Sequence, residues 1–359
     1  MKKFLLLALV FSLAALQSSE GQIRYVQASD FTLVGHAVNR PSGNPYHRID
    51  TARFSLPSGV EKQYLCPAGL AVAFRTNSPQ ITARWSTTPR SLYANMTPIA
   101  QRGLDLYIRR DGEWVWAGVG TPSENTHEAV VVQKMDSSWK ECLLYLPLFA
   151  ELTSLEIGID EGFSAVPMDD PFRHRVVIYG SSIAHGASGS RSGMAYPARL
   201  SRSSGIHFIN LGCSGNGKMQ REMWDVLVES KPDMLILDCM PNPSAKEIAE
   251  RTVPFVHYLR DRLPGVPIVL IQTTGRETVN FNHYFANMEA EKRAAAREAA
   301  RILKEEKVPD FYFIDGEDFL GLDHLGTCDG THPNDLGFDR MINKIAPKIF
   351  KILSRYGIR

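Results

Sequence analysis

The first half of the chain consists of short apolar stretches separated by polar turns. Two of them, residues 104–109 and 113–119, flank Asp111-Gly112, a dipeptide typical of tight hairpins. We expect two further strand pairs, residues 70–75 with 81–86 and residues 142–148 with 154–159. No long helical pattern occurs before Pro171, so residues 22–170 are predicted to form an all-β sandwich or jelly roll.

The second half, residues 171–359, alternates short β-branched runs with longer segments of helical period. Such alternation predicts α/β units whose parallel strands form one sheet covered by helices on both faces. The predicted strands are residues 175–179, 206–211, 234–238, 266–272 and 311–315. The predicted helices are residues 194–204, 218–230, 245–262, 283–306 and 336–355.

The N-terminus has the features of a secretory signal. Lys2 and Lys3 precede an apolar run over residues 4–16, and small residues follow over 18–21. That run is shorter than the roughly 20 residues that a membrane helix needs. We therefore expect residues 1–21 to be a signal peptide, and the protein to be secreted or periplasmic without a membrane span.

The charge and the cysteine content bear on three points: nucleic-acid binding, metal binding and disulfide bonds. Lys and Arg number 40 against 39 Asp and Glu, and no long basic run occurs, which argues against nucleic-acid binding. The five cysteines match no zinc spacing, so we expect no metal. Because their number is odd, at least one is unpaired within the chain. The sequence leaves undecided whether Cys66 and Cys142 form a disulfide.

Polar residues with complementary chemistry follow the predicted parallel strands. Ligands bind at the carboxyl ends of such strands. Ser182 follows the first strand, Gly215 the second and Asn242 the third, while Asp329 and His332 follow the fifth. These are the parts of an acyl-transfer site: a nucleophile, a base oriented by an acid, and donors for an oxyanion. The Ser182 and Gly215 N–H groups and the Asn242 amide are the predicted oxyanion donors.

These residues resemble the SGNH, or GDSL-type, hydrolase superfamily. The resemblance implies a three-layer α/β/α, flavodoxin-like domain with Ser182 as nucleophile, His332 as base and Asp329 as orienting acid. One departure is that the family's Gly-Asp-Ser is here Gly180-Ser181-Ser182. In the first half, the residues 103–107, Gly-Leu-Asp-Leu-Tyr, look like the GxDLY motif of a β-domain that precedes such esterase domains in bacterial secreted proteins.

The resemblance implies a cofactor-free serine esterase that removes short acyl groups, most simply acetyl, from a carbohydrate. Thr273 and Arg276 follow the fourth strand and are candidate contacts to a small-molecule or glycan ester. Two alternatives stay open: a carbohydrate-binding protein with an inactive esterase domain, and a lipid-directed esterase or lysophospholipase. The sequence does not determine the oligomeric state.

Overall fold

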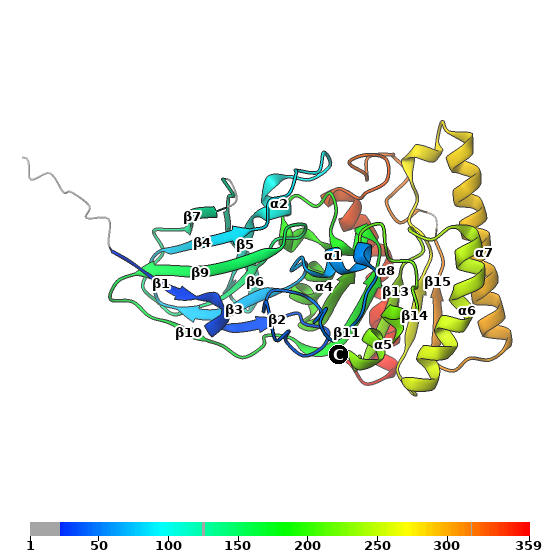
Figure 1. Ribbon diagram of the computed structural model, residues 1–359, viewed down its shortest axis with the longest axis horizontal. Coiled ribbons are helices and arrows are strands. Elements are labelled where there is room, and N and C mark those ends of the chain that lie inside the picture. Colours follow the sequence, from blue (N-terminus) through cyan, green and yellow to red (C-terminus); the bar gives the residue numbers. More distant parts are fainter. Residues whose placement is uncertain (1–21, 124–125, 317) are drawn as a thin grey trace, which may run out of the picture.

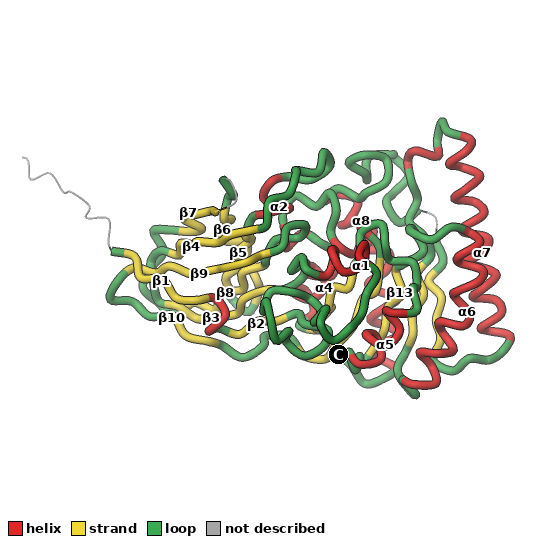
Figure 2. The backbone as a smooth tube through the Cα atoms, in the orientation of Figure 1, coloured by secondary structure: helices red, strands yellow, loops and turns green. Residues whose placement is uncertain are grey.

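The computed structural model describes residues 22–123, 126–316 and 318–359. The predicted signal peptide, residues 1–21, lies outside the described residues. The molecule is elongated, with strands gathered at one end and a helix-covered sheet at the other (Figure 1). Figure 2 shows the same division, because the helices lie almost entirely around the second sheet-containing half.

The N-terminal half is a sandwich of two antiparallel sheets. A shared apolar core, which includes Phe74, Trp85 and Leu144, lies between them. One sheet has the order β1 (Ile23–Gln27), β9 (Leu152–Asp160), β4 (Ile81–Thr87) and β7 (Thr126–Val132). The other has the order β10 (Ala165–Pro167), β3 (Ala71–Thr76), β8 (Lys140–Tyr145), β5 (Leu104–Arg110) and β6 (Glu113–Gly120), and β2 (Thr32–Val34) pairs with β3.

The sandwich confirms one expected strand pair and corrects two. Strands β5 and β6 form the predicted hairpin around Asp111-Gly112, where both residues have positive φ. The pairing of β3 with β4, and that of β8 with β9, is wrong, because each pair is divided between the two sheets. The connecting segments 77–80 and 146–151 carry the chain across the sandwich instead of reversing it within one sheet.

The C-terminal half contains the predicted five-stranded parallel sheet. Its order is β12 (Ile206–Gly212), β11 (Arg173–Gly180), β13 (Met234–Asp238), β14 (Ile268–Ile271) and β15 (Phe311–Ile314). The first strand in sequence thus lies second in space, which is the flavodoxin-like order. Side chains alternate between faces, so that Val176 and Ile178 enter one core while Val177 and Tyr179 enter the other.

Helices cover both faces of this sheet. One face packs against α3 (Ser182–His185), α4 (Tyr196–Ser204) and α8 (Asp335–Arg355). The other packs against α5 (Glu222–Glu229), α6 (Ala245–Arg262) and α7 (His283–Glu305). Short helices α1 (Ser58–Tyr64) and α2 (Pro98–Arg102) and the 3-10 helices Ala28–Asp30, Ser192–Met194 and Glu277–Val279 lie in connections.

One segment of the N-terminal half packs largely on the α/β core. Residues 37–64, including α1, contribute Ile49, Val60 and Tyr64 to the same core as β11 and α6. Within this segment Arg48 is buried, and its guanidinium donates to the carbonyl of Gly212 at 2.8 Å. A buried cation needs such acceptors. The end of β12, where the predicted glycine turn begins, is therefore held by a residue from the other half.

Candidate active site

Ser182 lies where β11 turns sharply into α3. Ser181 caps that helix, because its Oγ accepts from Ile183 N–H at 3.2 Å, and its side chain is buried. A Cβ on Gly180 would lie 2.5 Å from the Ala184 Cβ, so glycine permits the close approach of strand and helix. The two serines thus have different positions, and Ser182 rather than Ser181 has its hydroxyl directed at a base.

Ser182, His332 and Asp329 form a hydrogen-bonded line. The Ser182 Oγ lies 2.9 Å from His332 Nε2, and His332 Nδ1 lies 2.7 Å from Asp329 Oδ2. The other carboxylate oxygen, Oδ1, accepts from the backbone N–H groups of Thr331 and His332 at 3.0 and 2.8 Å. Partial burial acts to raise the pKa of Asp329, but its hydrogen bonds with His332 outweigh burial and lower it below the ordinary value. An ionised Asp329 orients the imidazole so that Nε2 can accept the serine proton.

The predicted oxyanion donors Gly215 and Asn242 follow β12 and β13, the two strands that flank β11. Gly215 has φ +69°, and a Cβ there would meet open space, so the left-handed backbone explains the glycine. The Asn242 Oδ1 accepts from Gly217 N–H at 3.1 Å, which leaves the NH₂ end of the amide as its donor. Gly217 packs tightly against the nucleophile turn, since its Cβ would lie 2.2 Å from the Gly180 carbonyl oxygen.

Asn95 also contacts the Asp329–His332 pair, although no feature of the sequence predicts this contact. It lies in the loop between β4 and α2 of the sandwich, 234 residues before Asp329, and its Nδ2 donates to Asp329 Oδ2 at 3.0 Å. The same nitrogen lies 3.2 Å from His332 Nδ1. When Nε2 accepts from Ser182, Nδ1 carries a proton, so the Asn95 amide can donate only to the carboxylate. No repeat, spacing or charge pattern in the sequence marks this residue.

The GxDLY motif fastens the sandwich to the catalytic half. Asp105 is fully buried, and its carboxylate accepts from Gly193 N–H at 2.8 Å and from Arg191 Nε at 3.2 Å. Tyr107 is buried in the same interface, where the Arg202 guanidinium lies 3.8 Å from its ring centroid. The motif therefore acts at the junction of the halves, close in sequence to the loop that carries Asn95.

Thr273 and Arg276 do not lie as expected. Thr273 is fully buried, so its side chain offers no exposed surface to a substrate in this geometry. The Arg276 guanidinium is engaged with Glu289, at 3.2 Å, and with the Pro241 carbonyl, at 2.7 Å. Both residues belong to a buried polar network beneath the loop that follows β13.

Other expectations concern the cysteines, metals and membranes. All five cysteines lie within the described residues and each is a free thiol, so the disulfide left open between Cys66 and Cys142 is not formed. Across residues 22–123, 126–316 and 318–359, no group of three or more His, Cys, Asp or Glu side chains is placed to hold a metal ion. No helix in that part of the chain is long and apolar enough to cross a membrane.

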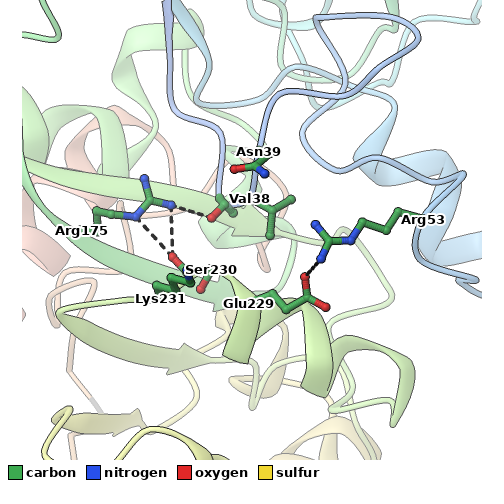
Figure 3. Close-up of a pocket in the computed structure, with 8 residues that line it drawn as sticks. Val38, Asn39, Arg53, Arg175, Glu229, Ser230 and Lys231 are labelled. Carbon is green, nitrogen blue, oxygen red and sulfur yellow. Dashed lines mark hydrogen bonds and ion pairs between the residues drawn. The ribbon is translucent and has the colours of Figure 1, made fainter.

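A cavity of about 320 Å³, drawn in Figure 3, is lined by Arg53, Arg175, Glu229 and Lys231 among others. Its lining includes Arg175 near the start of β11 and Lys231 just before β13, hence the amino ends of the strands. The Arg175 guanidinium donates to backbone carbonyls, including that of Ala37, and Arg53 pairs with Glu229. This cavity is separate from the Ser182 edge and offers no nucleophile–base pair.

Comparison with known families agrees with this geometry. Residues 173–350 match the GDSL-like lipase/acylhydrolase family, and residues 23–164 match the N-terminal GxDLY domain of SGNH-hydrolase-type esterases. The first match spans all five predicted oxyanion and triad residues, namely Ser182, Gly215, Asn242, Asp329 and His332. No curated protein matches the chain significantly.

Several solved structures resemble most of the chain. A Bacteroides ovatus protein described as a GDSL-like lipase is 51% identical over 93% of this chain and 98% of its own, with a TM-score of 0.91. The salicylyl-acyltransferase SsfX3 from a tetracycline biosynthetic pathway shares the fold at 18% identity, over 92% of this chain and 97% of its own, with a TM-score of 0.70. A family two carbohydrate esterase from Clostridium thermocellum, in complex with cellohexaose, does so at 12% identity, over 80% and 93%, with a TM-score of 0.59. With its two matched segments and a relative that aligns over nearly its full length, the chain belongs to the GDSL-like lipase/acylhydrolase family of SGNH-type hydrolases.

Proposed function

We propose that the protein is a serine esterase that hydrolyses short-chain acyl esters, acetyl above all, on a carbohydrate. The observation that carries the proposal is the continuous line from the Ser182 hydroxyl through His332 to Asp329. Membership of a hydrolase family supports ester cleavage. The carbohydrate is proposed on the fold shared with carbohydrate esterases. The acetyl group is proposed on the resemblance of the sequence motifs.

The reaction follows from the groups present. The Ser182 oxygen attacks the ester carbonyl carbon while its proton passes to His332 Nε2. The carbonyl oxygen becomes an oxyanion that the N–H groups of Ser182 and Gly215 and the Asn242 amide stabilise. As the C–O bond to the alcohol breaks, His332 returns the proton to the leaving oxygen. Water then attacks the acyl-serine, giving its proton to His332, and the acid leaves as Ser182 regains its hydrogen.

Asn95 extends the role of the sandwich. Its donation to Asp329 adds a fourth hydrogen bond to a carboxylate that already accepts three. The proposed effect is to keep Asp329 ionised and in one orientation, which in turn keeps the imidazole in line with Ser182. We further propose that the signal peptide directs export of the protein and that the mature protein acts outside the cytoplasm.

A lipid-directed esterase is the second candidate. Large apolar side chains are exposed after β14 and β15, in the connections and at the start of α7: Phe281, Tyr284, Leu322 and Leu325. Such side chains can contact long acyl chains. Chain length therefore separates the two candidates.

The test compares hydrolysis of p-nitrophenyl acetate, butyrate and octanoate by the wild type, Ser182→Ala and Ser181→Ala. We expect the acetate to be the best substrate, and Ser182→Ala to lose at least about a thousandfold in kcat. Ser181→Ala is the matched control, because it removes a hydroxyl one residue away that caps α3. Unchanged turnover in Ser182→Ala would refute the nucleophile, and a preference for octanoate would favour the lipid candidate. Measuring acetate release from acetylated glycans then tests whether the alcohol part of the ester is a carbohydrate.

A further inference from the structure

A buried network of charged side chains lies beneath the predicted oxyanion loop. Glu289 and Lys292 are three residues apart on α7, which places them on one helix face. They are 2% and 3% exposed, and Lys292 Nζ lies 3.2 Å from Glu289 Oε1. Arg276, from the connection after β14, places its Nε 3.2 Å from the same oxygen.

Burial of these charges is not explained by stability. Taking an ion pair out of water costs several kcal/mol, and apolar side chains of similar size are often as stable or more so. The rest of the same α7 face is apolar, with Ala296, Ala299 and Leu303 packed in the core. A role for the network beyond packing is therefore expected.

Both cations of the network donate to one backbone atom. Arg276 Nη2 and Lys292 Nζ each lie 2.7 Å from the carbonyl oxygen of Pro241, the residue directly before Asn242. The Asn242 side chain is held separately, because its Oδ1 accepts from Gly217 N–H. Backbone and side chain of the oxyanion donor are thus fixed from two sides.

We propose that Lys292 and Arg276 are positioning residues that preorganise the Asn242 amide for the oxyanion, with Glu289 holding the two cations in place. This inference rests on the proposed function, because it assigns Asn242 the oxyanion role. An oxyanion donor stabilises a transition state only if it is fixed in place before charge develops. A loop free to shift by a fraction of an ångström would keep substrate binding and lose rate.

The first test is a double-mutant cycle with p-nitrophenyl acetate. We expect Lys292→Met to lower kcat about tenfold with KM changed less than about twofold, a smaller loss than removal of a donor outright. In an Asn242→Ala background the same substitution is expected to change kcat less than about twofold, because the group it positions is gone. Lys292→Arg restores a donor and should recover part of the rate. Lys246→Met, at a Lys whose side chain is 83% exposed on α6, is the matched control.

An equal loss in both backgrounds would overturn the proposal, as would an unchanged kcat in Lys292→Met. If Lys292→Met does not fold, Arg276→Gln removes the other donor to the Pro241 carbonyl and enters the same cycle.

The second test does not depend on turnover. The side-chain NH₂ of Asn242 can be followed by NMR in protein labelled at asparagine, with Asn242→Ala for assignment. We expect this group to be more mobile in Lys292→Met than in the wild type, with the other asparagine amides unchanged. An equally ordered amide would refute positioning even if the esterase reaction is confirmed. If the wild type hydrolyses no ester, the NMR result still decides whether the network holds Asn242.

Discussion

Replacing Asp238 with asparagine should remove the contribution of this one buried carboxyl to the pH dependence of the protein's stability. Asp238 ends β13 beside Gly180, and its side chain is fully buried. The Tyr196 hydroxyl donates to its Oδ2 at 2.8 Å, and its Oδ1 has no partner among the described residues. Burial raises the pKa of Asp238 from 3.8 to about 7, with the Tyr196 hydrogen bond acting in the opposite direction.

The size and sign follow from linkage. A rise of about three pKa units corresponds to about 4 kcal/mol between the two protonation states. Below pH 3.8 the carboxyl is protonated in both the folded and unfolded chain, so it has no effect. Between pH 3.8 and about 7 the unfolded chain releases the proton while the folded chain keeps it, so stability falls as pH rises. Above about pH 7 the loss is complete and the contribution is constant.

The assay is urea unfolding followed by tryptophan fluorescence, from about pH 4 to about pH 8, on the wild type and Asp238→Asn. The variant's unfolding free energy should gain about 4 kcal/mol relative to the wild type across this range, whatever its level at pH 4. Tyr196→Phe is the second variant: loss of its hydrogen bond raises the pKa further, so the decline should extend above pH 7. Parallel curves for the wild type and Asp238→Asn would refute the reasoning.

Three further predictions concern the site and the junction. Asn95→Ala should lower kcat about fivefold with little change in KM, because one hydrogen bond to a partly exposed carboxylate is worth about 1 kcal/mol; an unchanged kcat would remove Asn95 from the mechanism. Asp105→Asn should lower the unfolding free energy by about 2 kcal/mol through loss of a buried ion pair, seen as a lower urea midpoint, and an unmoved midpoint would contradict the clamp. Gly217→Ala should cost more than about 2 kcal/mol by overpacking and reduce turnover, whereas Gly215→Ala, whose Cβ meets open space at φ +69°, should cost about 1 kcal/mol. The reverse order in thermal unfolding would contradict the account of these two glycines.

Where local signals were strong, the sequence predicted the elements closely. Helix α6 was predicted over the same residues as observed, and Ser244 and Glu247 form a capping box at its start. The helix expected from residue 218 begins only at Glu222, because Met219 adopts φ +57° and the chain still turns there. Apolar periodicity does not register such a left-handed residue.

Pairing between strands was less predictable. A four-residue polar connection such as 77–80 suits both a hairpin and a crossing between sheets, and the apolar pattern of the flanking strands is the same in either case. Which of the two forms depends on the strand that pairs with each flanking strand: β3 pairs with β8, and β4 pairs with β9. Those partners lie far along the chain, so no local window of sequence contains them.

The site shows the same limit. The closeness of Ser182, Asp329 and His332 was predictable because each follows a strand of one parallel sheet, and that topology brings strand ends together. Asn95 belongs to a different sheet system and contacts Asp329 only because the two halves dock. Arg276 follows a strand end as predicted, yet its guanidinium turns inward to Glu289 and Pro241. Position along the chain places a backbone at an edge, but the partners of its side chain depend on tertiary packing.

Hydrogen bonds of buried charged side chains join the two halves. Asp105 is fully buried and accepts from Trp116 Nε1 of the sandwich as well as from Arg191 and Gly193 N–H of the second half. Separation of the halves would break the two hydrogen bonds that cross the junction. From the other side, Arg48 donates to the Gly212 carbonyl at the end of β12. One contact lies beside the loop that reaches Asp329 and the other beside the turn that contains Gly215. The N-terminal half therefore contacts both Asp329 and the end of the strand that precedes Gly215. We predict that the second half alone would have a disturbed site even if its sheet folded.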